Sequence, residues 1–304
     1  MSQLHREGQD EPPDLSVVIG SHNARTSMRD CLTSLRKQRN GCRSEIVVVD
    51  NSTDGTDAIV SKEFPDVTLI RSSAEHWIPE LWEIGVRASR GSVVALTTAH
   101  CVPDEDWMKE ILAAHRDSTY VGIGGAIETD DSASITGSAV YLCRYARYMR
   151  PFEPRLIDDI PADNASYKRW ALDRCADVRA RGFWEPDIHA KLIAEGHRLW
   201  LTPKIGVRHR GSFTLAEFMS QRFWHGRQFG SSRARRLPMP VRLAHILATP
   251  LVPVVMLTRI ARQLIHKRRQ VGRFVLASPI LGLFLISWAS GEAFGYLRPS
   301  PTQA

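Results

Sequence analysis

The sequence predicts an α/β protein built around a mostly parallel sheet. Short, continuously apolar runs such as residues 15–19 and 45–49 alternate with segments of helical periodicity. Strands without polar alternation are typical of parallel sheets covered on both faces, and the order strand, helix, strand implies right-handed crossovers. A chain of 304 residues is long enough for one large domain or two.

The first third of the chain divides into alternating strands and helices. The expected strands cover residues 15–19, 45–49, 67–70 and 93–96. The expected helices cover about residues 26–38, 56–63 and 79–88. Further on, residues 121–127 (VGIGGAI) are expected to form a central strand whose glycines allow close backbone approach, and residues 199–202 a short strand.

Three of the expected strands end in polar clusters, at residues 21–23, 50–56 and 97–100. Since the carboxyl ends of parallel strands meet at one edge of a sheet, these clusters predict a crevice for a polar ligand. The same residue types suit ordinary turns and helix caps, which is the alternative interpretation of residues 50–56. Because G-x-G-x-x-G and G-x-x-x-x-G-K-[ST] motifs are missing, dinucleotide oxidoreductases and P-loop NTPases are disfavoured.

Four segments together resemble the nucleotide-binding half of family 2 glycosyltransferases with the GT-A fold. They are VVIGSHN, CLTSLRKQ, IVVVDNSTDGT and ASRGSVVAL, and the resemblance covers roughly residues 15–110. It implies a mixed, mostly parallel sheet flanked by helices. It also implies an enzyme of hexosyltransferase type that uses a nucleotide sugar as its donor.

The resemblance implies a set of donor-binding residues. These are Ser21, His22, Asn23, Asp50, Asp54, Thr98, His100, His209, Arg222 and Arg227. His22 stands where the family more often has Tyr, although its flat ring could still stack on a base. Arg222 and Arg227 lie in FMSQRFWHGR, which resembles the Gln-Arg-Trp signature of membrane-attached members with different spacing; the alternative is that both arginines face a membrane.

The resemblance also assigns catalytic and acceptor-side residues. Glu185 falls in the register of the general base that deprotonates the acceptor hydroxyl, and Asp187 in that of the following acid. A carboxylate at a helix start also suits a simple cap, so both interpretations stay open. Asn164, in a segment that resembles the family's sugar-contacting loop, and Trp184 are expected on the acceptor side.

The end of the strand at residues 93–96 departs from the family pattern. Members usually carry an Asp-x-Asp motif there, which holds a divalent ion on the donor diphosphate, but this chain has Thr98, Ala99 and His100. Oxygen ligands suit Mg²⁺ or Mn²⁺, and a neutral Thr–His pair suits them poorly. We therefore expect no confident metal site and an enzyme with weak metal dependence or none; loss of catalysis is the alternative.

Composition and resemblance divide the chain into four parts. Residues 1–14 are expected to be a disordered leader, and residues 15–212 a GT-A domain with a nucleotide-binding half (15–110) and an acceptor half (111–212). Residues 213–240 are expected to form a basic amphipathic linker helix. Residues 241–304 are expected to form membrane-associated helices.

The C-terminal part has two apolar segments, about residues 243–260 and 274–297, separated by a basic stretch at 262–273. If both segments crossed a membrane, the basic stretch would violate the positive-inside rule. We therefore expect the first segment, broken by Pro250 and Pro253, to be interfacial or re-entrant, and the second to be an anchor. The formal charge of +7 favours anionic membrane lipids over nucleic acid as the partner, because no nucleic-acid-binding motif accompanies it.

These features predict a glycosyltransferase at the cell membrane with its catalytic domain in the cytoplasm. The five widely spaced cysteines are expected to be reduced thiols, and the polar N-terminus does not resemble a signal peptide. The expected acceptor is lipid-linked or part of the cell envelope, and transfer is expected to invert the sugar's configuration. The alternatives are a non-catalytic sugar-nucleotide-binding scaffold and a nucleic-acid-binding protein.

Overall fold

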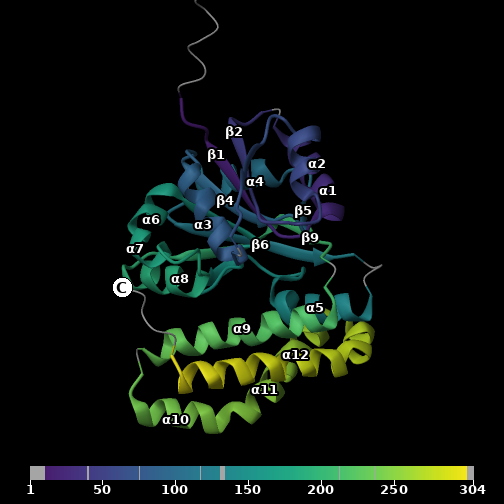
Figure 1. The fold of residues 1–304 in the computed structure, drawn as a ribbon, viewed down its shortest axis with the longest axis vertical. Helices are drawn as coiled ribbons and strands as arrows, with labels where there is room; N and C mark the ends of the chain where they lie inside the picture. Colours follow the sequence, from purple (N-terminus) through teal and green to yellow (C-terminus); the bar gives the residue numbers. More distant parts are fainter. Residues whose placement is uncertain are drawn as a thin grey trace, which may run out of the picture. The chain divides into compact units, whose positions relative to one another are not determined.

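The computed structural model describes residues 11–39, 41–74, 76–116, 118–130, 134–211, 213–235 and 237–299 (Figure 1). The chain divides into two compact units, residues 1–128 with 150–210 and residues 129–149 with 211–304. Most of the expected leader lies outside the described residues. At its end, Pro13 and Asp14 pair through backbone hydrogen bonds with Ser92, Val93 and Arg43.

The described residues of the first unit contain a nine-stranded mixed sheet with the order β3-β2-β1-β4-β8-β6-β9-β5, and β7 pairs with β9. The strands are β1 (Leu15–Ser21), β2 (Ser44–Asp50), β3 (Thr68–Arg71), β4 (Val93–Thr98), β5 (Cys101–Pro103), β6 (Gly122–Thr129), β7 (Arg155–Ile157), β8 (Asn164–Lys168) and β9 (Leu199–His209). The first four strands are parallel neighbours, as predicted, and β8 is antiparallel to β4. All seven residues of β1 are buried, so both faces of the sheet are covered.

Helices pack around this sheet. They are α1 (Arg25–Gln38), α2 (Thr56–Glu63), α3 (Ile78–Ala88), α4 (Trp107–Arg116), α6 (Arg169–Arg174), α7 (Ala176–Arg179) and α8 (Glu185–Ala194). The three helices expected in the first third are confirmed within one residue at each end. Leu81 of α3 packs against Val47 and Val49 of β2, which covers one face of the parallel part.

Two segments differ from the sequence prediction. The segment around Asn164 resembled a loop but forms β8, which pairs with β4 and β6. The strand expected at residues 199–202 continues to His209, because Ile205, Val207 and His209 are buried on one side and pair with β5 through residues 207–209. The predicted close approach at residues 121–127 is confirmed, since a side chain at Gly125 would collide with the carbonyl of Ile205.

The second unit is helical. It contains α5 (Ile135–Tyr145), the short 3₁₀ helices η1 (Ala146–Tyr148) and η2 (Thr249–Leu251), α9 (Leu215–Ala234), α10 (Met239–Ala248), α11 (Val252–Lys267) and α12 (Val271–Leu297). The helix α12 contacts α5, α9, α10 and α11. The predicted break near Pro250 is confirmed, because η2 separates α10 from α11.

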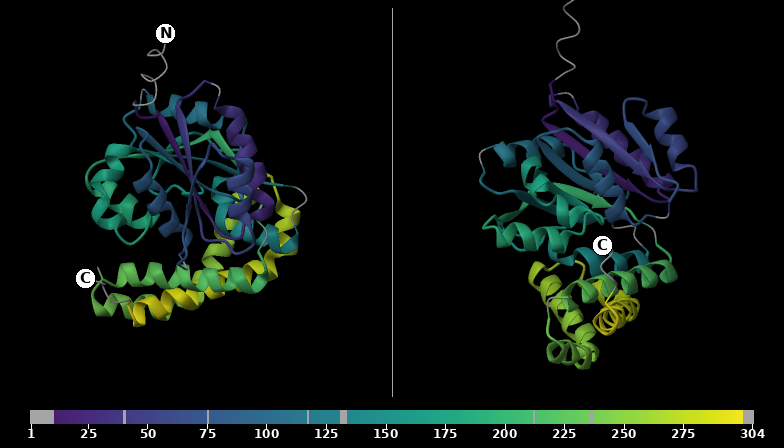
Figure 2. Two further views of the ribbon diagram at one scale, coloured as in Figure 1. Left: turned by 45° about the horizontal axis from the view of Figure 1, so that its top comes forward. Right: turned by 60° about the vertical axis from the view of Figure 1, so that its left-hand side comes forward.

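Helices α9 and α12 run parallel and pack backbone against backbone, side by side in both Figure 1 and Figure 2. A side chain at Gly226 or Gly230 of α9 would collide with the carbonyl of Trp288 or Glu292. Conversely, a side chain at Gly291 or Gly295 would collide with backbone carbonyls of α9. Small residues spaced four apart on both helices allow this close approach, as they do between helices in membranes.

Two helical segments are long and apolar enough, by length and composition, to cross a membrane. They are Met239–Lys267 and Val271–Leu297. Within the apolar 18-residue stretch of each segment, 6% of the first and 33% of the second are buried. Exposed apolar patches of this size are uncommon on monomeric soluble proteins.

Candidate functional site

The carboxyl ends of β1, β2 and β4 lie side by side, as predicted. Ser21 is opposite Asp50 in the β1–β2 pairing, and Gly20 is opposite Thr98 in the β1–β4 pairing. The structure therefore brings the three polar clusters to one edge of the sheet, where open α/β sheets bind ligands.

Hydrogen bonds tie the loop after β1 to the loop after β2. His22 Nδ1 lies 2.9 Å from Asn51 Oδ1, and the backbone N–H of Asn23 donates to Ser52 Oγ at 2.7 Å. Asn23 has a φ of 48°, in the left-handed region that Asn tolerates better than most residues. These contacts hold His22 in place while leaving its side chain exposed to a ligand.

Asp50 and Ser21 are buried at this edge of the sheet. The carboxylate of Asp50 is 2% exposed and accepts hydrogen bonds from Ser52 Oγ (2.6 Å) and the Ser52 N–H (3.2 Å). The hydroxyl of Ser21 is buried and has no hydrogen-bond partner within the described part of the chain. Asp50 is thus fixed by its own turn, at the place where the resemblance puts a base- or ribose-binding acid.

The side chain of Asp54 caps the starts of two helices. Its carboxylate accepts hydrogen bonds from the Thr56 hydroxyl (2.5 Å), the Thr56 N–H (3.1 Å) and the Arg25 N–H (3.1 Å), at the starts of α2 and α1. Burial acts to raise the pKa of Asp54, but these hydrogen bonds outweigh it and hold the pKa below its ordinary value. The cap interpretation therefore accounts for Asp54 without a ligand.

The end of β4 offers no carboxylate to a metal ion. The Thr98 hydroxyl donates to Cys101 Sγ at 3.6 Å, and His100 Nδ1 lies 3.1 Å from Ser27 Oγ. Within the described ranges, no group of three or more His, Cys, Asp or Glu residues is arranged to hold a metal. This donor set does not fit Mg²⁺ or Mn²⁺, which prefer several oxygen ligands.

His209 comes to the same region on β9. It is 5% exposed and lies opposite Cys101 in the β5–β9 pairing. The N–H of the next residue, Arg210, donates to the carbonyl of His100 at 2.7 Å, while its guanidinium pairs with Asp30. His100 and His209, two of the three histidines in the predicted donor set, therefore lie on adjoining segments.

Glu185 begins α8, and its carboxyl group lies deep although the residue as a whole is partly exposed. The N–H of Ala162 donates to Glu185 Oε1 at 3.3 Å. Burial raises the pKa of Glu185 to about 7; backbone N–H groups oppose this shift, and the negative charges of Asp159 and Asp163 add to it. A carboxyl group with such a pKa accepts and releases protons near neutral pH.

Two hydrogen bonds connect Glu185, through residues 162 and 163, to β4. The Thr97 hydroxyl on β4 donates to the carbonyl of Asp163 at 3.0 Å, and the preceding residue, Ala162, holds Glu185. The candidate base is therefore anchored to the strand that ends in Thr98 and His100.

The remaining predicted residues of this unit have mixed surroundings. Asp187 lies in the first turn of α8, and the indole N–H of Trp184 donates to the carbonyl of Arg181 at 3.2 Å. The Asn164 amide is fully buried and is bonded to Trp107 Nε1, the Ala126 carbonyl and the Ile205 carbonyl. Asn164 therefore joins three strands and α4 in the core.

Arg222 and Arg227 lie on α9 in the second unit. The guanidinium of Arg222 stacks over Phe218, and that of Arg227 lies over Trp224 and Phe294. The Nε atoms of both arginines are buried without a hydrogen-bond partner in the described residues. Their predicted donor role stays a prediction.

The sequence did not predict a chain of polar contacts beside Glu185, in which Tyr167 and His189 are buried and Asp159 is half-exposed. Asp159 Oδ1 lies 3.0 Å from His189 Nδ1, and His189 Nε2 lies 2.8 Å from the Tyr167 hydroxyl. His189 is four residues after Glu185, hence on the same side of α8, and this spacing was the available signal. The chain joins α8 to β8 and to the loop that holds Glu185.

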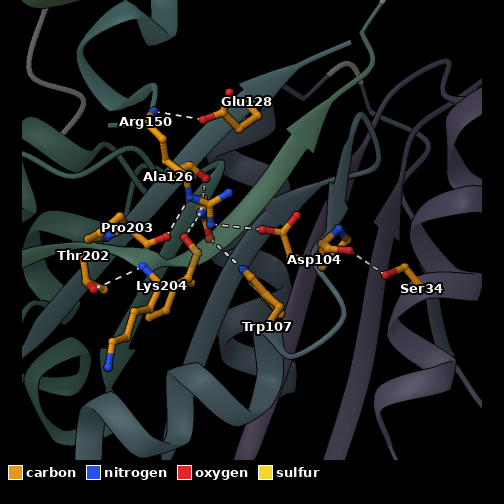
Figure 3. Close-up of polar contacts among 12 residues, drawn as sticks. Ser34, Asp104, Trp107, Ala126, Glu128, Arg150, Thr202, Pro203 and Lys204 are labelled. Atoms are coloured by element: carbon orange, nitrogen blue, oxygen red, sulfur yellow. Dashed lines mark hydrogen bonds and ion pairs between the residues drawn. The ribbon is translucent and has the colours of Figure 1, made fainter. Parts of the chain in front are cut away.

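A cavity of about 650 Å³ lies elsewhere, along residues 103–107 at the start of α4, with Glu110 and Lys204. Next to it, Arg150 joins three segments, bonding to Asp104, to the Pro203 carbonyl and, through its backbone N–H, to Glu128 (Figure 3). None of the predicted site residues lines this cavity. These contacts explain how residues 103–107 are held, and we assign the chemistry to the strand ends.

The mixed, mostly parallel sheet with flanking helices is a fold of the GT-A class. The sequence profile "Glycosyl transferase family 2" matches residues 16–175, more than half of the chain. The chain belongs to this family and is a glycosyltransferase. Glu185 and His209 lie beyond the matched residues.

A solved structure supports the fold. The mannosyltransferase PcManGT from Pyrobaculum calidifontis, in complex with GDP-Man and Mn²⁺, has a TM-score of 0.59 at 18% identity, covering 93% of this chain and 88% of that one. S. aureus TarS is less similar, with a TM-score of 0.48 at 14% identity over 69% of this chain and 38% of that one. A comparison with curated protein sequences finds no match.

Proposed function

We propose that this glycosyltransferase transfers a sugar, with inversion, from a nucleotide-sugar donor to a lipid-linked or cell-envelope acceptor at the cell membrane. The catalytic unit works in the cytoplasm. The observation that carries the proposal is the Glu185 carboxyl group, which is buried, has a pKa of about 7 and is hydrogen-bonded through residues 162–163 to the end of β4.

Glu185 supplies the general base that inversion requires. The acceptor hydroxyl attacks the anomeric carbon from the side opposite the leaving group, and its proton passes to the ionised Glu185 carboxylate. The new glycosidic C–O bond forms as the bond to the diphosphate oxygen breaks, and the nucleoside diphosphate leaves with the bonding electrons. Proton and charge balance without a redox partner.

The leaving diphosphate needs positive charge or hydrogen-bond donors. Because the side chains at the end of β4 do not fit a divalent ion, we assign this role to His100 and His209 with nearby arginines. Two arginines of the first unit contact this edge through their backbone N–H groups: Arg25, which donates to Asp54, and Arg210, which donates to the carbonyl of His100. Arg222 and Arg227 are further candidates.

The acceptor class rests on the second unit. Its two long apolar segments support attachment to a bilayer, where a lipid-borne acceptor would be met. The similarity to a protein crystallised with GDP-Man supports a nucleotide-sugar donor and does not choose the sugar.

A donor panel tests the proposal. Thermal shift with common nucleotide sugars, with and without divalent metal, identifies the donor by the stabilisation it produces. Turnover of that donor in membranes is then compared between the wild-type chain and Glu185→Gln. We expect donor binding to persist and turnover to fall by about a hundredfold to ten-thousandfold.

Two results would count against the proposal. Unchanged turnover in Glu185→Gln would remove Glu185 from the base role. Binding of a donor without turnover on any lipid or glycan acceptor would instead favour a sugar-nucleotide-binding scaffold, for which the loss of both Asp-x-Asp carboxylates is the supporting feature.

A further inference from the structure

The second unit carries a large exposed apolar surface whose geometry limits how it meets a membrane. Six large apolar residues of α12 are exposed. They are Val271, Val275, Leu276, Leu283, Ile286 and Leu297. At about 3.6 residues per turn they fall on one side along the whole length of the helix. Most of the other side is buried, including Gly291, Glu292 and Gly295. On α10, η2 and α11, Leu247, Leu251 and Val254 add to the exposed apolar surface.

We infer that the second unit lies in the surface of one membrane leaflet, with all its helix ends on the side of the catalytic unit, and that no helix crosses the bilayer. The inference rests on the membrane association proposed above and specifies its form. It departs from the sequence-based expectation that the last apolar segment is a spanning anchor.

The first step concerns α9, which is too polar to cross. Its 20 residues include Glu217, Arg222, Arg227 and Arg233, and it is not among the candidate spans found in the described residues. A charged residue at the centre of a bilayer costs at least about 2.5–3.5 kcal/mol, and this helix would carry several. Both ends of α9 therefore lie on the side where the chain leaves the first unit.

The second step concerns the end of α12, which is fixed to the end of α9. Gly295 packs directly on the backbone at Arg227 and Ser231. Arg233 Nη1 also lies 3.7 Å from Glu292 Oε1. Because the two helices are parallel and in backbone contact, the C-terminal end of α12 stays on the same side as the C-terminal end of α9.

The third step concerns the turn before α12. Lys267 Nζ donates to the carbonyls of Ala146, Arg147 and Met149, and Arg273 Nη1 donates to the carbonyl of Asp130. Asp130 and Met149 are each within two residues of the first unit along the chain. The turn at 268–270 is therefore on the catalytic side too, so α10–α11 starts and ends there and α12 does the same.

The charge of the second unit indicates which kind of lipid the leaflet contains. The chain has no Asp or Glu between Glu217 and Glu292. Arg259, Arg262 and Arg268 are exposed next to the apolar surface. An in-plane helix with apolar residues on one side and basic residues at its border binds anionic lipid, with its apolar side at the boundary between headgroups and acyl chains.

Cysteine labelling tests the geometry in the full-length chain. A Cβ at Gly272 or at Gly282 meets open space, so Gly272→Cys and Gly282→Cys add a thiol without a clash, and Arg298→Cys marks the end of α12. Right-side-out and inverted membrane vesicles are treated with a membrane-impermeant maleimide. Asp106→Cys, at an exposed position of the first unit, marks the catalytic side, and the wild-type chain gives the background.

We expect Gly272→Cys, Arg298→Cys and Asp106→Cys to be labelled from the same face. Gly282→Cys should be protected in both vesicle types and labelled in detergent. Labelling of Gly272→Cys and Arg298→Cys from opposite faces would overturn the inference, because α12 would then span. Labelling of Gly282→Cys in intact vesicles would overturn it as well, because the apolar side would not be immersed.

Vesicle flotation tests the leaflet. The purified full-length chain should float with phosphatidylcholine–phosphatidylglycerol vesicles more strongly than with phosphatidylcholine alone. Replacing Arg259, Arg262 and Arg268 by Gln should weaken binding to the anionic vesicles about a hundredfold, since each basic residue near such a surface contributes about fivefold.

A triple variant with Arg29, Arg71 and Arg87 replaced by Gln provides the control, because it changes the charge equally on exposed arginines of the first unit. Equal loss of binding in both triple variants would refute the assignment of the anionic contact to the second unit. Donor turnover in detergent, measured on the same samples, separates a failure of this inference from a failure of the proposed function.

Discussion

At the scale of single residues, we expect the proposed base Glu185 to set the acid limb of the pH profile. Its carboxyl group must be ionised to accept a proton, and burial raises its pKa to about 7. The group is protonated below this pH and ionised above it. We therefore expect kcat/KM to rise with pH through about 7 and to level off above it, as measured in a pH series with the natural donor.

The neighbours of Glu185 supply a control for this profile. The negative charge of Asp163 helps to raise the pKa of Glu185, so Asp163→Asn should move the acid limb to lower pH. The residual activity of Glu185→Gln should no longer rise with pH through about 7. A limb that persists unchanged in Glu185→Gln would show that another group titrates.

The Thr98–His100 pair leads to a second prediction about single residues. Because these side chains lack the oxygen ligands that Mg²⁺ and Mn²⁺ prefer, activity should survive exhaustive chelation within about twofold. The double change Thr98→Asp with His100→Asp should create metal-dependent donor binding, measured by thermal shift with and without Mn²⁺. Complete loss of wild-type activity on chelation, restored by metal, would contradict the assignment.

At the scale of elements, four glycines are constrained by the backbone of the opposite helix: Gly226 and Gly230 of α9, and Gly291 and Gly295 of α12. A methyl group at Gly291 would meet the carbonyl of Phe223, whereas one at Gly282 meets nothing. We expect Gly291→Ala to lower the melting temperature in detergent, because the two backbones must separate. Gly282→Ala should leave it unchanged or raise it, since Ala favours a helix by about 1 kcal/mol over Gly.

This pair of variants discriminates between packing and propensity. Both changes are Gly to Ala in the same helix, so they share the gain in helix propensity. Equal melting temperatures for the two variants would mean that α9 and α12 are not in backbone contact.

Strands and helices could be predicted from the sequence where the local order of apolar and polar residues determines them. The buried runs at 15–19, 45–49 and 93–96 lack alternation and end in polar residues, so both the strands and the donor edge followed from the sequence. The long-range partners were not predictable. Nothing local in Asn164 indicates that its amide binds Trp107 and two carbonyls, and nothing local in residues 135–145 indicates a helix that packs on α12.

In the candidate site, too, some features follow from the local sequence and others depend on contacts between distant segments. Glu185 was predicted as the base from the family resemblance, but its depth and its contact with Ala162 depend on a loop 23 residues earlier. The Asp159–His189–Tyr167 chain joins three separate segments, and only the four-residue spacing of Glu185 and His189 pointed to it. Strand ends follow from periodicity, whereas contacts between distant segments require the folded chain.

At the scale of the whole molecule, the chain passes between the two units three times, after residues 128, 149 and 210. Each unit is therefore assembled from two stretches of sequence. A shortened chain that ends at residue 238 keeps α5 and α9 but removes their shared partner α12. We expect it to aggregate without detergent, as measured by size-exclusion chromatography.

A different deletion should behave in the opposite way. Replacing residues 129–149 by a short Gly-Ser linker and ending the chain at residue 210 retains only the first unit. This chain should stay soluble and bind the donor in a thermal-shift assay. Aggregation of this version, with solubility of the version ending at residue 238, would contradict the division into units.

Residues 129–149 belong to the second unit but interrupt the sequence of the first, and this arrangement bears on how the protein evolved. A helical tail that was simply appended to a finished enzyme could be exchanged between relatives by recombination at one junction. Here α5 lies between β6 and β7 in sequence but packs with α12, near the far end of the chain. A chimaera joined at residue 211 would place a foreign α12 on the resident α5, so the two stretches must be inherited, or exchanged, together.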